Sequence, residues 1–190
     1  MLVLISGPSG SGKTTVAKKL AENYDDMVIA VSHTTRPMRP GEKDGIDYYF
    51  IDKKTFAEML ENGEFVEYFH FHGNDYGMSY AELERILSEG KNALVVIYPT
   101  MAEQFQIYCR DHDCIKVYLT APIEELIRRI KKRGGNSKEI QQRIENLYKE
   151  LEDKQFFNAD ITIDNLNSDV TVEILADIIR ERSRKAQIAL

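Results

Sequence analysis

A glycine-rich stretch between an apolar run and a helical pattern limits most strongly what this chain can fold into. Residues 7–14 read GPSGSGKT, which fits the phosphate-binding pattern G-x-x-x-x-G-K-[ST]. The apolar run at 2–6 predicts a buried strand before it, and residues 13–23 predict a helix after it. Backbone amides in such a turn form an anion site at a helix N-terminus. Lys13 can reach the outer phosphates of a nucleotide, and the Thr14 hydroxyl can ligate Mg²⁺.

Apolar strands and helical patterns alternate along the rest of the chain. Strand-like runs lie at 2–6, 27–31, 93–97, 114–120 and 159–164. Helices are expected at 13–23, 79–89, 100–111, 122–133, 137–155 and 168–185. Ser79 with Glu82, and Thr100 with Glu103, have capping-box spacing, and Pro122 stands where a first helical residue would. The alternation predicts βαβ units, and therefore an α/β fold with a parallel central sheet covered on both faces.

Two segments interrupt the alternation. Residues 33–80 carry the strand-like pieces DYYFI and FVEYFHFH, expected to be antiparallel, which predicts a small mixed αβ insertion on the sheet. Residues 124–150 are highly charged and carry Gly134-Gly135, which predicts a hinge or loop between two helices. The expected core therefore comprises residues 1–32 and 81–190, with the segment at about 124–150 as a lid.

Composition excludes several classes of protein. The net charge of −6, from 25 basic and 31 acidic residues, argues against a general nucleic-acid binder. The two cysteines, Cys109 and Cys114, fit neither a zinc site nor a C-x-x-C motif and are expected to be reduced thiols. The N-terminal MLVLIS fits neither a signal peptide nor a membrane span, so we expect a cytoplasmic protein without a membrane partner. The sequence leaves monomer and homodimer open.

An arginine pair in the insertion indicates a second anion site. Arg36 and Arg39 are three residues apart in a segment that prolines hold extended. Neighbouring guanidinium groups repel each other unless an anion lies between them, and arginine suits bidentate phosphate recognition. Tyr48 and Tyr76 could add neutral donors. The alternative for this stretch is a solvated basic loop.

A second basic cluster lies in the expected lid. It comprises Arg128, Arg129, Lys131, Lys132, Arg133 and, beyond the glycines, Arg143. Charged helices are often solvated faces, which is the alternative here. Phosphoryl transfer, however, needs cations that neutralise charge on the transferring group, and a closing lid excludes water. Three anion-binding elements on one chain predict a phosphoryl donor, a phosphorylated acceptor and a lid.

The order of these motifs resembles the guanylate kinase family over essentially the whole chain. The matching stretches are GPSGSGKTT (7–15), VSHTTRPMRPGEKDGIDYYF (31–50), GEFVEYFHFHGNDYG (63–77), RRIKKRG (128–134) and ITIDN (161–165). The pattern T-T-R-x-x-R-x-G-E-x-x-G-x-D-Y is specific to this family, whereas a bare phosphate-binding loop is not. The resemblance implies a P-loop NTPase three-layer sandwich with an acceptor-binding insertion and a helical lid. It also implies the reaction of ATP and GMP to ADP and GDP with Mg²⁺.

The resemblance implies a set of site residues. ATP would be bound by Gly7, Pro8, Ser9, Gly10, Ser11, Gly12, Lys13, Thr14 and Thr15, with Thr14 on the metal. The acceptor phosphate would be bound by Ser32, Arg36, Arg39, Tyr48 and Tyr76. The catalytic cations would be Lys13, Arg36, Arg129, Arg133 and Arg143. Glu67 corresponds to the acid that reads the guanine edge, because a carboxylate accepts from the N1–H and the exocyclic amine. Asp164 and Asn165 lie near the family's adenine-side motif.

The chain departs from the family pattern around the base. After the strand at 93–97 the family usually has [LE]-[ED]-I-D-x-Q-G, where this chain reads VVIYPTM. Val96 and Tyr98 thus stand at acidic positions, and Met78 stands where a hydroxyl residue touches guanine. We therefore expect Met78 and Tyr98 to line the acceptor site. Losing two hydrogen-bond partners, at about 1–3 kcal/mol each, would weaken GMP binding roughly ten- to thousand-fold unless another group compensates.

Three functions remain open on the sequence alone. The first is a guanylate kinase with an unusual base pocket, which the arginine and tyrosine set and Glu67 favour. The second is a kinase of the same fold for another acceptor, either another nucleoside monophosphate or ribose bisphosphate. The third is a non-catalytic binding module of this fold, against which the intact Lys13, Thr14 and lid arginines argue.

Overall fold

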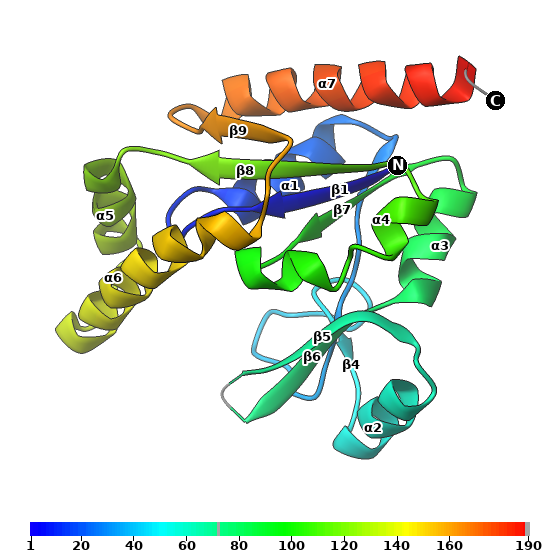
Figure 1. Cartoon of the computed structure of the whole chain (residues 1–190). Coiled ribbons are helices and arrows are strands. Elements are labelled where there is room, and N and C mark those ends of the chain that lie inside the picture. Colours follow the sequence, from blue (N-terminus) through cyan, green and yellow to red (C-terminus); the bar gives the residue numbers. More distant parts are fainter. Residues whose placement is uncertain (72, 189–190) are drawn as a thin grey trace.

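A parallel sheet of five strands forms the centre of this computed structural model, which describes residues 1–71 and 73–188, with side chains up to residue 185 (Figure 1). The strand order is β2-β7-β1-β8-β9, and every neighbouring pair is parallel. The strands are β1 (Leu2–Ser6), β2 (Met27–Ile29), β7 (Asn92–Val96), β8 (Cys114–Thr120) and β9 (Ile161–Asp164). The expected parallel sheet is confirmed, although β2 is shorter than the apolar run at 27–31 suggested.

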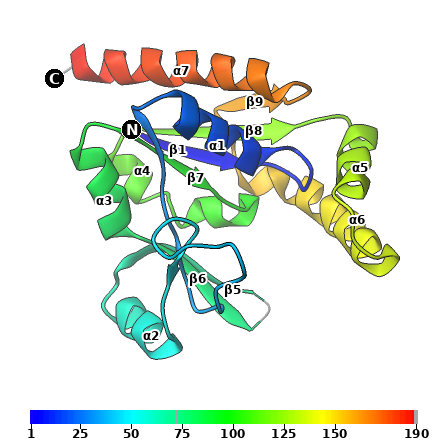
Figure 2. The same cartoon turned by 180° about the vertical axis from the view of Figure 1, so that it is seen from behind.

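Helices cover both faces of this sheet, because alternate side chains of β1 point to opposite sides. Val3 and Ile5 pack with α1 (Lys13–Asn23) and α7 (Ser168–Ile188) in one apolar cluster. Leu2 and Leu4 belong to a second cluster on the other face, with α3 (Tyr80–Ser88) and α4 (Tyr108–Asp111). The three layers are visible in Figures 1 and 2. The expected three-layer sandwich is therefore confirmed.

The helix expected at 100–111 is wrong as a single element. The chain instead forms a short 3₁₀ helix, η1 (Pro99–Glu103), then a turn, and then the four residues of α4. Pro99 opens the turn, so Thr100 lies inside it and no capping side chain is present. The capping box expected at Thr100 is wrong for the same reason. The break lets Phe105 and Tyr108 both enter the core.

Only one of the two hydrogen bonds of the capping box expected at Ser79 and Glu82 is present. The Ser79 hydroxyl accepts a hydrogen bond from the Glu82 amide at the start of α3, at 3.3 Å. The Glu82 carboxylate does not reach back to Ser79 but accepts from the Val31 amide at 2.9 Å. Glu82 therefore ties α3 to the segment that enters the insertion rather than completing a capping box.

A second sheet of four strands, in the order β4-β3-β6-β5, forms the insertion. Its elements are β3 (His33–Thr34), β4 (Tyr49–Phe50), α2 (Lys53–Glu61), β5 (Phe65–Phe71) and β6 (Asn74–Ser79). β5 and β6 are antiparallel as expected, with His72 of the quoted stretch outside the described residues. β4, however, pairs parallel with β3, so the antiparallel expectation for DYYFI is wrong. The loop at 35–48 carries the chain back to the end where β3 began, which makes a parallel partner possible.

The Gln104 side chain of the core forms hydrogen bonds with the outer strand of this insertion. The Gln104 side-chain oxygen accepts from the Tyr68 amide at 3.1 Å, and its nitrogen donates to the Tyr68 carbonyl at 3.2 Å. Figure 2 shows the insertion on the side of the main sheet away from α7. The pair of bonds therefore fixes β5 against the segment that follows β7.

The segment predicted to be a lid, called the lid below, consists of α5 (Ile123–Lys132) and α6 (Ser137–Glu152), followed by a short 3₁₀ helix, η2 (Asp153–Phe156). Gly134 and Gly135, with φ of 74° and 123°, form the connection that the sequence predicted. Pro122 is the N-cap of α5 rather than its first residue. Among the described residues, the lid helices pack in an apolar cluster of their own, in which Leu147 is the only buried residue of α6.

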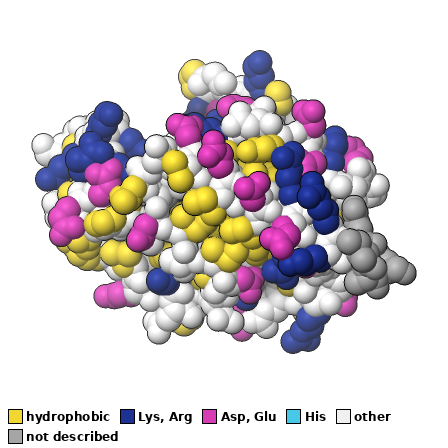
Figure 3. Space-filling view, turned by 90° about the horizontal axis from the view of Figure 1, so that it is seen from above, with side chains coloured by type: hydrophobic (Ala, Val, Ile, Leu, Met, Phe, Trp, Pro, Cys, Tyr) yellow, Lys and Arg dark blue, Asp and Glu magenta, His cyan; other side chains and the backbone are white. Residues whose placement is uncertain are grey.

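Charge is distributed unevenly over the surface. Figure 3 shows Lys and Arg side chains gathered at the end of the molecule that the lid forms and again toward the opposite end. The face over α7 carries hydrophobic side chains among charges of both signs in the same view. Among the described helices, none has both the length and the apolar character needed to cross a bilayer.

Candidate active site

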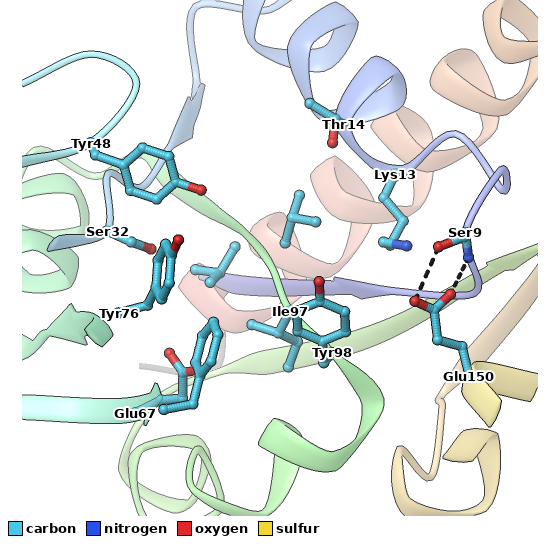
Figure 4. A pocket seen from close by; sticks show the side chains of 13 residues that line it. Ser9, Lys13, Thr14, Ser32, Tyr48, Glu67, Tyr76, Ile97, Tyr98 and Glu150 are labelled. Atoms are coloured by element: carbon cyan, nitrogen blue, oxygen red, sulfur yellow. Dashed lines mark hydrogen bonds between the residues drawn. The ribbon is translucent and has the colours of Figure 1, made fainter. Parts of the chain in front are cut away.

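A cavity of about 290 Å³ lies between the phosphate-binding loop, the end of β7 and the insertion (Figure 4). Its lining comprises Ser9, Lys13, Thr14, Ser32, Tyr48, Glu67, Phe69, Tyr76, Val95, Val96, Ile97, Tyr98 and Glu150. These residues come from the core, the insertion and the lid. The fold thus brings segments that are far apart in sequence to one hollow at the carboxyl edge of the parallel sheet, where ligands of open α/β sheets bind.

Glycine is required at the loop that borders the cavity. Gly10 and Gly12 have φ of 87° and 92°, which side-chain-bearing residues rarely adopt. At Gly7 a Cβ atom would lie 2.0 Å from the Leu119 carbonyl oxygen. Gly12 is the N-cap of α1, so the loop delivers its amides directly to a helix N-terminus. This geometry is compatible with the anion site that the sequence predicts.

Lys13 is folded back onto the loop. Its Nζ donates to the carbonyls of Gly7, at 2.6 Å, and Pro8, at 3.2 Å. Burial lowers the pKa of Lys13 to about 8, against the opposing effect of the Glu150 carboxylate. A phosphate group would restore the charge that burial disfavours, so this ammonium is suited to an anionic ligand.

Thr14 has the properties of a metal-binding hydroxyl. It is exposed, lines the cavity, and is drawn in Figure 4 with its hydroxyl directed into the open space. The described residues contain no cluster of three or more His, Cys, Asp or Glu side chains that would hold a metal ion by itself. Mg²⁺ takes few protein ligands and relies on phosphates and water. One hydroxyl beside a phosphate site therefore fits Mg²⁺ brought in with a nucleotide.

The end of the cavity beside the insertion contains one acid with a strongly shifted pKa. The Glu67 side chain is 4% exposed, and burial raises the pKa of this carboxyl to about 7. Its carboxyl forms no hydrogen bond to another residue within the described part of the chain. Ser32, Tyr48 and Tyr76 line the same region. A buried acid without a partner, surrounded by hydroxyl groups, has the chemistry to recognise polar donors of a ligand.

The arginine pair lies beside these tyrosines. The Arg36 guanidinium donates two hydrogen bonds of 2.8 Å to the Glu42 carboxylate and lies 5.3 Å from the Tyr48 ring centre. Hydrogen bonds from Arg36 lower the pKa of Glu42 to about 2. The Arg39 amide also donates to Glu42, at 2.8 Å, while the Arg39 side chain is exposed. Glu42 thus holds Arg36 at the cavity edge; neither arginine is among the residues that line the cavity.

An aromatic wall closes the cavity on the side of the altered positions. Tyr98 is 42% exposed, and its ring meets Phe69 edge to face. Phe69 stacks on Tyr76, with ring centres 5.1 Å apart. Burial is the main factor that raises the pKa of Tyr98, so its hydroxyl remains a donor at neutral pH. Val96 adds an apolar contact beside Tyr98.

Met78 is not brought to this site. Its side chain is 1% exposed and packs in the core cluster that includes Leu83 and Ile97. The expectation that it lines the acceptor pocket is therefore wrong for this structure. Met78 pairs with Glu67 across the sheet, but its side chain is taken up by the apolar cluster that includes Leu83 of α3 and therefore does not reach the cavity.

The lid arginines divide between different surroundings. Arg129 and Arg133 line a separate hollow of about 430 Å³ with Gly10, Thr15 and Asn165. The Arg129 guanidinium donates to the Asn165 backbone carbonyl at 2.7 Å, and the Asn165 side-chain amide donates to the Ser11 carbonyl at 2.7 Å. Asp164 is the last residue of β9 and directly precedes Asn165. The hollow thus lies on the outer side of the phosphate-binding loop.

Arg143 lies apart from both hollows. Its guanidinium donates to the Gly134 carbonyl at 3.0 Å, at the connection between α5 and α6. Most of the expected residues therefore lie around the phosphate-binding loop, divided between the cavity and the separate hollow, whereas Met78, Arg39 and Arg143 lie in neither.

Four lining residues were missed by reasoning on the sequence: Phe69, Val95, Ile97 and Glu150. Phe69 lies two residues after Glu67 on β5, so strand alternation could have placed it beside the acid. Glu150, on α6, accepts hydrogen bonds from the Ser9 amide and, at 3.0 Å, from the Ser9 hydroxyl. It belongs to a helix of many charges, where no local pattern separates it from its neighbours.

Comparison with known proteins gives a consistent result. A family model described as guanylate kinase matches residues 1–182. Similar curated proteins include the guanylate kinase of Clostridium perfringens, 36% identical over 97% of this chain and 85% of its own length. That of Synechococcus sp. is 39% identical over 87% of this chain and 76% of its own length. The crystal structure of guanylate kinase from Anaplasma phagocytophilum superposes with a TM-score of 0.73 at 31% identity, covering 96% of this chain and 86% of that one.

Proposed function

This chain belongs to the guanylate kinase family, and from this membership we infer that it transfers a phosphoryl group from ATP to GMP. One observation carries the inference within the molecule: a single cavity connects Lys13 and Thr14 of the phosphate-binding loop with Glu67 of the insertion. A donor phosphate at one end and an acceptor base at the other would place the acceptor phosphate between them. This is the arrangement that in-line transfer requires.

The donor end is proposed to act through backbone amides and two side chains. The amides of the phosphate-binding loop and the Lys13 ammonium would bind the donor phosphates. The Thr14 hydroxyl would hold Mg²⁺, which supplies positive charge to the transferring phosphoryl group when bound. Arg129 and Arg133 lie on the outer side of the loop, where lid closure would bring them to the donor. Transfer then needs no covalent intermediate on the protein.

The acceptor end is proposed to bind GMP through its phosphate and its base. Ser32, Tyr48 and Tyr76 line the cavity, and Arg36 lies at its edge, so these four would bind the acceptor phosphate. Arg39 would join them if its exposed side chain turned inward. The Glu67 carboxylate would accept from two donors on guanine, a pair that adenine does not present. Tyr98 would contact the base with its ring or its hydroxyl.

A second acceptor remains a candidate because of Val96 and Tyr98. These side chains line the cavity where the family pattern has acids, and they make that wall more apolar. A wall without these acids offers fewer hydrogen-bond acceptors to guanine, so the same fold could serve another nucleoside monophosphate or ribose bisphosphate. We also propose that the protein works in the cytoplasm, where cysteines such as Cys109 and Cys114, which form no disulfide with each other in this structure, stay reduced.

An acceptor panel tests the proposed function. Initial rates of ADP formation from Mg-ATP are measured with GMP, dGMP, AMP, UMP, CMP and ribose bisphosphate. We expect the highest kcat/KM for GMP, with AMP at least about tenfold lower because the Glu67 contact is lost. A higher kcat/KM for any other acceptor would replace GMP as the substrate while leaving the transfer chemistry in place.

A further inference from the structure

An acidic side chain of the lid occupies the phosphate-binding loop. The Glu150 carboxylate accepts from the Ser9 backbone amide and from the Ser9 hydroxyl. Figure 4 shows these two bonds, with Glu150 reaching from α6 to the loop beside Lys13. Of the lining residues of the cavity, only Glu67 and Glu150 carry carboxylates, and they lie at opposite ends.

The contacts of Glu150 are those that an anionic ligand would make. A carboxylate, like a phosphate, offers negatively charged oxygens to backbone amides and hydroxyls, and such charge-assisted bonds are stronger than neutral ones. Lys13 lies close enough for Glu150 to oppose the fall in its pKa. In the free protein, the carboxylate thus supplies part of the negative charge that a bound phosphate would bring to the loop.

Glu150 and a donor phosphate cannot both stay at this place. The Ser9 donors can serve one set of oxygens at a time, and two anions in one enclosed site repel each other. Binding of a nucleotide must therefore move the carboxylate away. Its departure breaks one of the contacts between α6 and the core.

The rest of α6 is held loosely enough to respond. Leu147 is its one buried residue in the described structure, within a cluster that belongs to the lid. Gly134 and Gly135 lie before the helix in left-handed conformations. The helix is therefore joined to the core through few contacts, of which the one at Ser9 is directed at the donor site.

We propose that Glu150 is an internal occupant of the phosphate-binding loop, which the donor nucleotide displaces as it binds. The displacement releases α6 from Ser9, so that donor binding and lid position are coupled. Glu150 thereby lowers donor affinity in the free protein. This inference rests on the proposed function only in taking a nucleotide phosphate as the ligand of the loop.

A matched pair of variants tests the competition. Glu150→Gln removes the charge with little change of shape, and Glu152→Gln makes the same change on an exposed side chain of the same helix. The Kd of ADP is measured by calorimetry in EDTA, so that metal binding does not contribute. We expect Glu150→Gln to bind ADP about tenfold more tightly than wild type, and Glu152→Gln to match wild type. An unchanged or weaker affinity in Glu150→Gln overturns the proposal.

A second measurement follows the helix itself. The chain has no tryptophan, so Tyr148→Trp, at a side chain that is 50% exposed on α6, introduces a single indole. We expect ADP to change the indole emission with a midpoint equal to the calorimetric Kd. In the Glu150→Gln background the emission should already be shifted before ADP is added. Emission that stays constant while calorimetry records binding overturns the coupling to α6.

The outcome is separable from that of the acceptor panel. Both measurements here use ADP alone and need no acceptor or turnover. A protein that failed to phosphorylate GMP could still show tighter ADP binding in Glu150→Gln. Conversely, an active guanylate kinase whose ADP affinity did not respond to the substitution would retain its proposed function and lose this inference.

Discussion

Phe69 of the insertion and Tyr98 of the core meet edge to face, with ring centres 6.0 Å apart and planes at 84°. The contact joins the two parts of the molecule across the rim of the cavity. Edge-to-face pairs of this kind contribute about 0.5–1.5 kcal/mol beyond the area that they bury. The wall beside the acceptor base is therefore aromatic and held in place, where the family pattern has an acid.

Replacing Tyr98 with an acid should strengthen the reaction with GMP. Tyr98→Asp would supply a carboxylate at the end of β7, able to accept from donors on guanine. One regained hydrogen bond to a charged group corresponds to about 1.5–3 kcal/mol, so kcat/KM for GMP should rise about tenfold or more. Steady-state rates against GMP concentration measure this. A fall in kcat/KM would show that the aromatic wall itself supports the reaction.

The Tyr98 hydroxyl can be tested apart from the ring. Tyr98→Phe keeps the edge-to-face contact with Phe69 and removes only the donor. If the hydroxyl bonds the base, we expect KM for GMP to rise about tenfold with little change in kcat. An unchanged KM would limit Tyr98 to packing.

Turnover of GMP should depend on pH through Glu67. The pKa of this carboxyl is raised to about 7, and only the ionised form accepts two hydrogen bonds from guanine. We therefore expect kcat/KM for GMP to increase as pH rises from 6 to about 7.5. Glu67→Gln should be less active and should not show this increase. A pH profile of the variant parallel to that of wild type would assign the titration to another group.

Glu67 should also lower the stability of the fold at neutral pH. Its pKa lies near 4.5 in the unfolded chain and about 7 in the folded protein, so the folded state retains a proton that the unfolded state releases. Stability is then lost as pH rises from about 4.5 to 7, by about 3 kcal/mol in total. Glu67→Gln should be more stable than wild type by about this amount at pH 8 and equally stable near pH 4. Urea unfolding at the two pH values gives the comparison.

Lys13 should control both the rate and the upper pH limit for ATP. Lys13→Ala should lower kcat at least about a hundredfold, because the ammonium neutralises charge on the transferring group. Because burial lowers its pKa to about 8, kcat/KM for ATP in wild type should fall as pH rises above 8. Bound phosphate restores the charge, so kcat at saturating ATP should hold to higher pH. Coincident falls of both parameters would contradict the assignment.

Arg39 should act on acceptor binding rather than on the chemical step. Its side chain is exposed in the free protein and would reach the acceptor phosphate only when the insertion closes. Arg39→Ala should raise KM for GMP about tenfold with kcat nearly unchanged. Arg110→Ala, a surface arginine on α4, serves as the control. An unchanged KM would exclude Arg39 from the acceptor site.

The layers and the donor loop could be predicted because their patterns are local. Alternating apolar runs predict the parallel sheet, and the spacing of Gly7, Gly12 and Lys13 predicts an anion site at the loop. The direction of β4 could not be predicted, since a two-residue strand carries no directional pattern and the loop before it decides the partner. The helix predicted at 100–111 is not continuous. Pro99 begins a 3₁₀ helix, and the break after it allows Phe105 and Tyr108 both to be buried in the core.

The base pocket could be predicted only in part. Family motifs place Glu67 and Tyr98 by position, and the structure brings both to the cavity. They do not say which neighbours a side chain finds in the folded protein, and so the motif predicts Met78 in the pocket although it packs in the core. The contact between Glu150 and Ser9 depends on how α6 packs against the phosphate-binding loop. The residues next to Glu150 in the sequence carry no pattern that predicts this packing.

The amide of Gln104 has a consequence for solubility. β5 is the outer strand of the small sheet, and a strand at the edge of a sheet can pair through its backbone with a strand of another molecule. By bonding both backbone groups of Tyr68, the Gln104 side chain acts as a one-residue neighbouring strand and occupies the middle of that edge. Gln104→Ala would leave the Tyr68 amide and carbonyl available for pairing with a strand of another molecule. The strand that carries them has the aromatic sequence FVEYFHF. The same bonds that position the insertion thus guard the chain against self-association through β5.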